Sequence, residues 1–371
     1  MDRDWLERLR STTAEHADAR QLPREAFVTQ AAFDLDRSIH LSAWLPVCHV
    51  SEIAFPGAFF AVEVLGERLL VVRGADLELG AFFDRCAHRG TPLTEGEQGR
   101  LERLELVCPY HGLAYDLRGR AREPHATRLA VGGRTLERAW VAERFGFVFV
   151  AAREPARSLH DEVAPPWLER GSLHALRLAR RVRYEVLANW KLCVENFQES
   201  HHFASVHPRL ERLTPFSRSS SHDFGGRFLG GSMELVDGAE TVSESASLLG
   251  RRFVAAEQDR RTVRDAHLFP GWLTSLQPDY FLSYRVQPLD PGRTRVVAEI
   301  FVHAESPRAA EEDLFVFWDR TNAEDRSICE RQQRGVSAAS YGPGPYGPSE
   351  DGVHAFDRLV ATEYLRLAAT V

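Results

Sequence analysis

The stretch ENFQESHHFASVHP, residues 195–208, is a dense group of metal-capable side chains. It contains two carboxylates and three histidines within thirteen residues, shortly after an Asn-Trp-Lys triplet that begins at Asn189. One histidine alone in such a run would be read as solvated or hydrogen-bonded in the core. The density of the run favours a metal site instead, with His202 and His207 as ligands and His201 as a third candidate.

The spacing of the two histidines constrains the local backbone. We predict a helix over residues 189–206, in which acidic and histidine side chains recur at intervals of four and three, at Glu195, Glu199 and His202. Five positions on a straight helix correspond to about 140° of rotation, so His202 and His207 cannot share one face. The helix is therefore expected to end or deform after His202, and Pro208 is consistent with an exit there.

Two short loops earlier in the chain form a second group of metal ligands. They read CAHRG at residues 86–90 and CPYHG at residues 108–112, so each loop offers one Cys and one His. Zinc sites of mixed type more often pair Cys with Cys and His with His. A Rieske 2Fe–2S centre needs two Cys on one iron and two His on the other, which two such loops supply from both sides. The spacing favours a Rieske cluster, with zinc as the alternative.

Composition and charge exclude several classes of protein. The 371 residues suffice for one large domain or two ordinary ones. No run of about 18 apolar residues occurs, so no membrane span is expected. The first residues lack the features of a signal peptide, and we expect a cytoplasmic protein. The net charge of −7, with both signs interspersed, argues against nucleic acid as a partner, and five cysteines do not indicate a disulfide framework.

Hydrophobic periodicity predicts two domains after an N-terminal segment. Residues 1–40 are expected to form a helix and an arm. Short strand-like runs separated by glycine turns predict a small all-β domain over 41–155, which carries both Cys-His loops. Residues 156–371 combine alternating strands with long helical segments, which predicts an antiparallel sheet with packed helices. The fold class is therefore α+β. Residues 216–263 are rich in Ser, Gly and Arg and are assigned to no element.

Both groups of ligands resemble those of Rieske non-haem iron ring-hydroxylating oxygenases. Residues 41–152 look like the Rieske domain of that family, because both Cys-His loops are close to its usual loops. The pattern Asn-Trp-Lys, Glu-Asn-Phe, Glu-x-x-His-x-x-x-x-His-Pro over 189–208 resembles the family's catalytic domain. The resemblance implies an alpha, or terminal oxygenase, subunit whose catalytic domain is helix-grip-like.

The resemblance also implies the site residues. The 2Fe–2S ligands would be Cys86, His88, Cys108 and His111, and the mononuclear Fe(II) would be held by His202, His207 and a carboxylate from the segment 322–335. The matching position is Asp325. On the residues alone, an acid in so charged a helix belongs on a solvated face, and Glu324 is the main competitor. Glu199 and Asn189 are the positions expected to act in catalysis.

The family's assembly implies how the two centres cooperate. Its members form head-to-tail homotrimers in which the cluster of one subunit lies beside the iron of the next. A carboxylate bridges the two centres, and it maps to Glu199, with His111 and His202 as partners. A flavin and iron–sulfur reductase, or a ferredoxin, would reduce the cluster, and the cluster would pass electrons to the neighbour's iron, where O₂ and substrate meet.

The substrate class is left open between aromatic and quaternary ammonium compounds. Many family members carry Asp at the bridge, whereas some that act on quaternary ammonium compounds carry Glu, so Glu199 favours the latter class. Cation recognition needs an aromatic cage. Candidates that are equally compatible with plain core are Phe197, Phe203, Phe228, Trp272, Tyr280, Phe281 and Trp318. The alternative function is a Rieske-type electron-transfer or zinc-stabilised binding protein without oxygenase activity. Hydroxylation, oxidative dealkylation, and mono- or dioxygenation are not distinguished.

Overall fold

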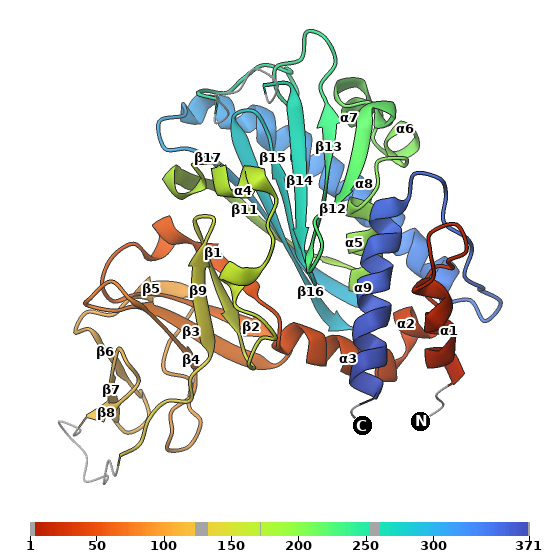
Figure 1. Cartoon of the computed structure of the whole chain (residues 1–371). Helices are drawn as coiled ribbons and strands as arrows, with labels where there is room; N and C mark the ends of the chain where they lie inside the picture. The colour runs from red at the N-terminus through yellow and green to blue at the C-terminus, as the bar shows by residue number, and fades with distance from the viewer. Residues whose placement is uncertain (1–3, 123–132, 171, 253–259, 370–371) are drawn as a thin grey trace. The chain divides into compact units, whose positions relative to one another are not determined.

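The chain forms two compact units (Figure 1). The computed structural model describes residues 4–122, 133–170, 172–252 and 260–369. The first unit is His40–Asp161, and the second unit combines Met1–Ile39 with Glu162–Val371. The N-terminal segment, expected to be a separate helix and arm, therefore belongs to the second unit, and the first unit ends slightly later than the expected residue 155. Within the described residues, no helix is both long and apolar enough to cross a bilayer.

The first unit consists of antiparallel strands, which confirms the predicted all-β domain. Leu65 and Gly66 close one of its hairpins with φ angles of 50° and 86°, the left-handed conformation that a two-residue hairpin turn requires. The apolar strand faces are buried in two cores. Three sheets result: β1 (Leu45–His49), β10 (Phe147–Ala151) and β9 (Trp140–Arg144); β4 (Leu79–Phe83), β3 (Glu67–Arg73), β2 (Ala58–Val64) and β5 (Gln98–Arg100); β6 (Glu105–Val107), β7 (Ala114–Asp116) and β8 (Ala121–Arg122).

The second unit is built on one seven-stranded antiparallel sheet. Its order is β11 (Leu176–Val186), β17 (Arg293–His303), β16 (Tyr280–Asp290), β15 (Trp272–Leu276), β14 (Thr262–Leu268), β13 (Phe228–Glu234) and β12 (Ser219–Asp223). The last three strands begin within residues 216–263, which the sequence assigns to no element. Gly and Ser have little strand propensity, so hydrogen-bonded pairing with β15 decides the conformation of this region.

Helices complete the second unit and confirm the predicted α+β class. They are α1 (Asp4–Thr12), α2 (Glu25–Val28), α3 (Gln30–Leu41), α4 (Pro166–Arg170), α5 (Trp190–Phe197), α6 (Phe203–Val206), α7 (Pro208–Leu213), α8 (Glu311–Val336) and α9 (Asp351–Ala368). Helix α5 contacts α8, α9 and β16, and α9 lies along β12 and β13 (Figure 1). The N-terminal helices share this core, because Trp5 of α1 packs edge-on against Tyr364 of α9 at 5.8 Å between ring centroids.

The prediction of one helix over residues 189–206 is wrong. Helix α5 ends at Phe197, well before His202, and the chain turns through Ser200 before the single turn of α6. The Glu199 carboxylate accepts backbone N–H groups of His201 and His202, which stabilises this turn in place of helical hydrogen bonds. Pro208 begins a further helix, α7, at a position where its missing N–H costs nothing.

Candidate metal centres

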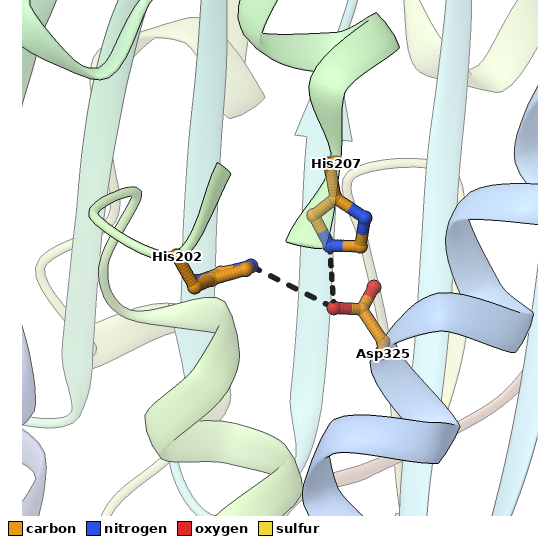
Figure 2. Close-up of side chains that lie close together, drawn as sticks. All are labelled: His202, His207 and Asp325. Carbon is orange, nitrogen blue, oxygen red and sulfur yellow. Dashed lines mark hydrogen bonds and ion pairs between the residues drawn. The ribbon is translucent and has the colours of Figure 1, made fainter. Parts of the chain in front are cut away.

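His202, His207 and Asp325 form a group whose ligand atoms all lie within 4.8 Å of one another. Asp325 Oδ1 lies 2.8 Å from His207 Nε2 and 3.7 Å from His202 Nε2. Figure 2 shows both imidazole rings pointing toward this carboxylate from separate parts of the chain. Two imidazoles and one carboxylate converging on a point are the donor set of the facial triad that binds non-haem Fe(II).

Three different elements bring these ligands together. His202 follows the turn after α5, and His207 lies between α6 and α7 with φ −118° and ψ 65°, which changes the chain direction there. Asp325 lies on α8, which packs against both α5 and α6. The non-helical backbone between His202 and His207 resolves the problem that two histidines five positions apart cannot share one helix face.

Each histidine is also held by a glutamate on its other ring nitrogen. His202 Nδ1 donates to Glu199 Oε1 at 2.6 Å, and His207 Nδ1 donates to Glu324 Oε2 at 2.7 Å. A carboxylate on Nδ1 fixes the tautomer and leaves the Nε2 lone pair for a metal. The donor set and its supporting carboxylates therefore fit a mononuclear iron. Glu324, the competitor for the ligand position, instead supports the ligand His207.

The electrostatics of the group favour a bound cation. Burial lowers the pKa of His207, but the hydrogen bonds and charges of Asp325 and Glu324 outweigh it and raise the pKa overall. Burial acts to raise the pKa of Glu199, and its hydrogen bonds to His202 and to two backbone N–H groups lower it overall. Both shifts show that the carboxylates stabilise positive charge at the imidazoles, which a metal ion supplies without a proton.

The remaining polar residues of the run lie outside the ligand group. His201 is exposed and stacks near Phe216, with ring centroids 5.8 Å apart. Glu195 is buried on α5 beside Asp357, where burial and that second carboxylate raise its pKa well above the usual value. Asn196 lies at the site, with its Nδ2 atom 3.4 Å from His202 Nε2.

Asn189, which the resemblance implied to be catalytic, has a structural position. It is the N-cap of α5, and its side-chain oxygen accepts from the Lys191 N–H at 3.0 Å. Its Nδ2 donates to the carbonyl oxygens of Phe27 and Pro291, at 3.2 and 2.8 Å. The described residues that line the cavity at the metal site do not include it. Asn189 therefore joins the N-terminal segment to the start of the ligand-bearing region.

A cavity of about 160 Å³ lies beside the ligand group. Every second residue of β14, β15 and β16 lines it, so one face of the sheet forms one wall, and α8 and the His202 turn form the other. The aromatic side chains of the lining are Tyr184, Phe197, Phe203, Tyr284 and Trp318. Of the cage candidates proposed from sequence, three line the cavity, whereas Phe228, Trp272, Tyr280 and Phe281 are buried outside its lining.

In the first unit, the two Cys-His loops have the same backbone geometry. The Cys86 N–H donates to Thr91 and the Gly90 N–H donates back to Cys86; Cys108, Leu113 and Gly112 repeat this pattern. Gly90 and Gly112 have φ angles of 76° and 72°, which residues with a side chain rarely adopt. The two equivalent turns present both sulfurs and both imidazoles.

These loops fit a two-iron cluster better than a single zinc. The His88 and His111 rings lie 5.0 Å apart, and Cys86 and Cys108 are buried free thiols. His111 Nδ1 is buried without a hydrogen-bond partner among the described residues, which leaves it available as a ligand atom. A tetrahedral zinc would draw all four ligand atoms together, but within the described chain no three of them meet the 4.8 Å condition that the His202 group meets.

Comparisons with known proteins agree with both sites. Residues 173–365 match the family model of the ring hydroxylating alpha subunit (catalytic domain), and residues 43–132 match the Rieske [2Fe-2S] domain. The glycine betaine monooxygenase oxygenase subunit of Chromohalobacter salexigens is 28% identical over 92% of this chain and 86% of its own length. The carnitine monooxygenase oxygenase subunit of Escherichia coli (strain K12) is 28% identical over 94% of this chain and 95% of its own length.

Solved structures share the fold over nearly the whole chain. A quaternary ammonium Rieske monooxygenase in complex with L-carnitine has a TM-score of 0.79 at 24% identity, covering 95% of this chain and 97% of its own. Naphthalene 1,2-dioxygenase from Rhodococcus sp. has a TM-score of 0.79 at 17% identity, covering 99% of this chain and 98% of its own. These matches support an oxygenase over the alternative of an electron-transfer or zinc-stabilised binding protein. The chain belongs to the alpha subunits of the Rieske ring-hydroxylating oxygenases.

Proposed function

We propose that this chain is a terminal oxygenase that oxidises a small alkylammonium compound at an iron held by His202, His207 and Asp325. The observation that carries the proposal is the convergence of these three side chains beside a cavity of about 160 Å³. When bound, the cluster delivers electrons from a reductase or ferredoxin, and the mononuclear iron activates O₂ at its open coordination positions. The protein's own groups then orient the ligands and the substrate.

Glu199 has a second role in this proposal. Its carboxylate holds the Nδ1–H of His202, and its side chain is only 15% exposed. In a head-to-tail homotrimer it would bridge to His111 of a neighbouring copy and connect that copy's cluster to this iron. The unpartnered Nδ1 of His111 supports this arrangement, because coordination through Nδ1 leaves Nε2 free to donate to a carboxylate.

The choice of an alkylammonium substrate rests on relatives and on residues. Two relatives that span nearly the whole chain are oxygenase subunits named for glycine betaine and carnitine. The cavity is lined by tyrosine, phenylalanine and tryptophan rings, whose faces attract cations. Aromatic hydrocarbons remain the competing class, because naphthalene dioxygenase shares the fold. We place the protein in the cytoplasm, where a reductase would meet it.

The proposal is tested by metal content and coupled oxygen uptake. Purified protein is expected to show a Rieske absorption band and electron-spin signal plus one further iron per subunit. His202→Ala should lose the further iron and keep the cluster. With a surrogate reductase, O₂ uptake should follow glycine betaine or carnitine and yield an oxidised product, with naphthalene as the comparison. Colourless protein with two zincs, or His202→Ala protein that keeps all its metal, would contradict the proposal.

A further inference from the structure

The cavity contains a carboxylate, Asp265, to which the iron chemistry gives no role. It lies on β14, where it pairs with Gly231 of β13 and with Ser275 of β15. Paired positions in an antiparallel sheet face the same side, and all three residues line the cavity. Asp265 therefore faces the space that the substrate would occupy, on the wall opposite the helix that carries Asp325.

Hydrogen bonds hold this carboxylate but do not neutralise it. The Ser275 hydroxyl donates to Asp265, and Ser275 Oγ in turn accepts from Gln277 Nε2 at 2.8 Å. Asp265 Oδ1 is buried and has no hydrogen-bond partner within the described part of the chain. An ionised carboxylate in such a place is strongly unfavourable without a counter-charge, and burial accordingly raises the pKa of Asp265 to about 7. The fold thus provides a negative group whose partner must come from a ligand.

The surroundings of Asp265 leave room for such a partner. At Gly231, a Cβ atom would meet only the Ser220 backbone, with its oxygen at 3.0 Å, among the described atoms within 4 Å. The absent side chain keeps the strand beside Asp265 open toward the cavity. Tyr284 and Phe197 also line this space, with ring centroids 6.4 Å apart. Their rings add cation-attracting faces to the carboxylate.

Tyr284 relates Asp265 to the metal site. Burial raises the pKa of the Tyr284 hydroxyl most, and the charges of Tyr184, Asp325 and Asp265 add to the shift. The hydroxyl therefore lies within electrostatic range of both an iron ligand and Asp265. A small substrate can contact Asp265 at one end and present its N-alkyl group to the iron at the other.

We propose that Asp265 is the counter-charge for the ammonium group of the substrate and that it selects cationic over neutral substrates of the same shape. The proposal rests on the proposed alkylammonium oxygenase and names the residue that recognises the cation. A neutral substrate would displace water from Asp265 and leave the carboxylate buried without a partner, so discrimination comes from a penalty on the wrong ligand as well as attraction for the right one.

The test compares a cation with its neutral carbon isostere. Choline and 3,3-dimethylbutan-1-ol have the same shape and differ in the charge of one atom. Calorimetric binding to the purified, metal-loaded protein should show choline bound at least about tenfold more tightly, because loss of one partner of a buried charge pair is costly. Asp265→Asn should abolish the preference, and Asp265→Glu should keep part of it. Asp237→Asn is the matched control, because that carboxylate is 91% exposed and outside the cavity lining.

Each result decides for or against Asp265. A choline preference in the wild type that disappears in Asp265→Asn and survives in Asp237→Asn supports the proposal. If Asp265→Asn does not fold, the wild type and Asp265→Glu decide through the same comparison of probes. Equal affinity for both probes in the wild type, including no binding of either, overturns it, as does an unchanged preference in Asp265→Asn. Because binding is measured without turnover, a charge preference without coupled O₂ uptake would refute the proposed oxygenase and leave the role of Asp265 standing.

Discussion

Glu324→Gln tests whether retention of the mononuclear iron depends on the carboxylate behind His207. Glu324 Oε2 accepts from His207 Nδ1 at 2.7 Å, while Nε2 of the same ring faces Asp325 at 2.8 Å. Glutamine keeps the length of the side chain and an acceptor oxygen, but it removes the negative charge that makes the imidazole a better ligand. Supporting partners of this kind typically change metal affinity by about 10–100-fold.

The exposure of Glu324 sets where in that range the effect falls. Its side chain is 32% exposed, whereas that of His207 is 1% exposed, so water partly screens the lost charge. We therefore expect about a tenfold loss of iron affinity for Glu324→Gln and a loss nearer a hundredfold for Glu324→Ala, which also frees the ring to rotate. Asp325→Ala should lose the iron altogether, because it removes a ligand.

The assay measures iron retained per cluster during a chelator titration. The Rieske absorption is an internal reference, since its ligands lie in the first unit. Asp319→Asn is the matched control, because Asp319 lies on the same helix and pairs with Arg180 at the surface at 2.7 Å. If Glu324→Gln and Glu324→Ala retain as much iron as the wild type and Asp319→Asn, the supporting role assigned to Glu324 is refuted.

Three further predictions follow from other contacts. Asp36→Ala removes the counter-charge of Lys191, a pair 2.7 Å apart with both side chains fully buried, and should lower the free energy of unfolding by about 3–5 kcal/mol in a denaturant titration; a surface-sized change would argue against a buried ion pair. Gly352→Ala would place a Cβ atom 2.5 Å from the Gln198 carbonyl oxygen, just before Glu199, and should cost about 1–3 kcal/mol and reduce iron retention, whereas Gly335→Ala, with nothing within 4 Å, should do neither. Asp265 has a pKa of about 7, so it is protonated below that pH; choline affinity should rise as the pH increases through about 7, and a flat profile between pH 6 and about 8 would contradict the assignment.

Much of the chemistry could be predicted from short stretches of sequence. The cluster loops each need only five residues, because a Cys, a His and a left-handed glycine define a turn that presents two ligands. The alternating strands 272–276 and 294–302 and the long helix that carries Asp325 were also predictable, because each has a clear hydrophobic period. The two-domain α+β organisation follows from these elements.

Other features depend on residues that are distant in sequence. Helix α5 ends at Phe197 because the Glu199 carboxylate caps a turn and α9 packs closely there, with Gly352 against Gln198; helical periodicity continues past this point and gives no warning. Strands β12–β14 contain Gly and Ser where strands usually have β-branched residues, so only pairing with β15 defines them. The lone acid between Val263 and His267 in an alternating run was the one available signal for Asp265.

By itself, the sequence determined which chemical groups this protein has: two Cys-His loops for a cluster, and two histidines with a distant acid for an iron. Only the tertiary structure decided which acid serves which role. Asp325 and Glu324 are adjacent on α8, yet one faces Nε2 of His207 and the other Nδ1, because the turn between α6 and α7 orients that ring against the helix. Ligand type is a property of single residues, whereas the direction of a lone pair depends on packing between segments more than a hundred residues apart.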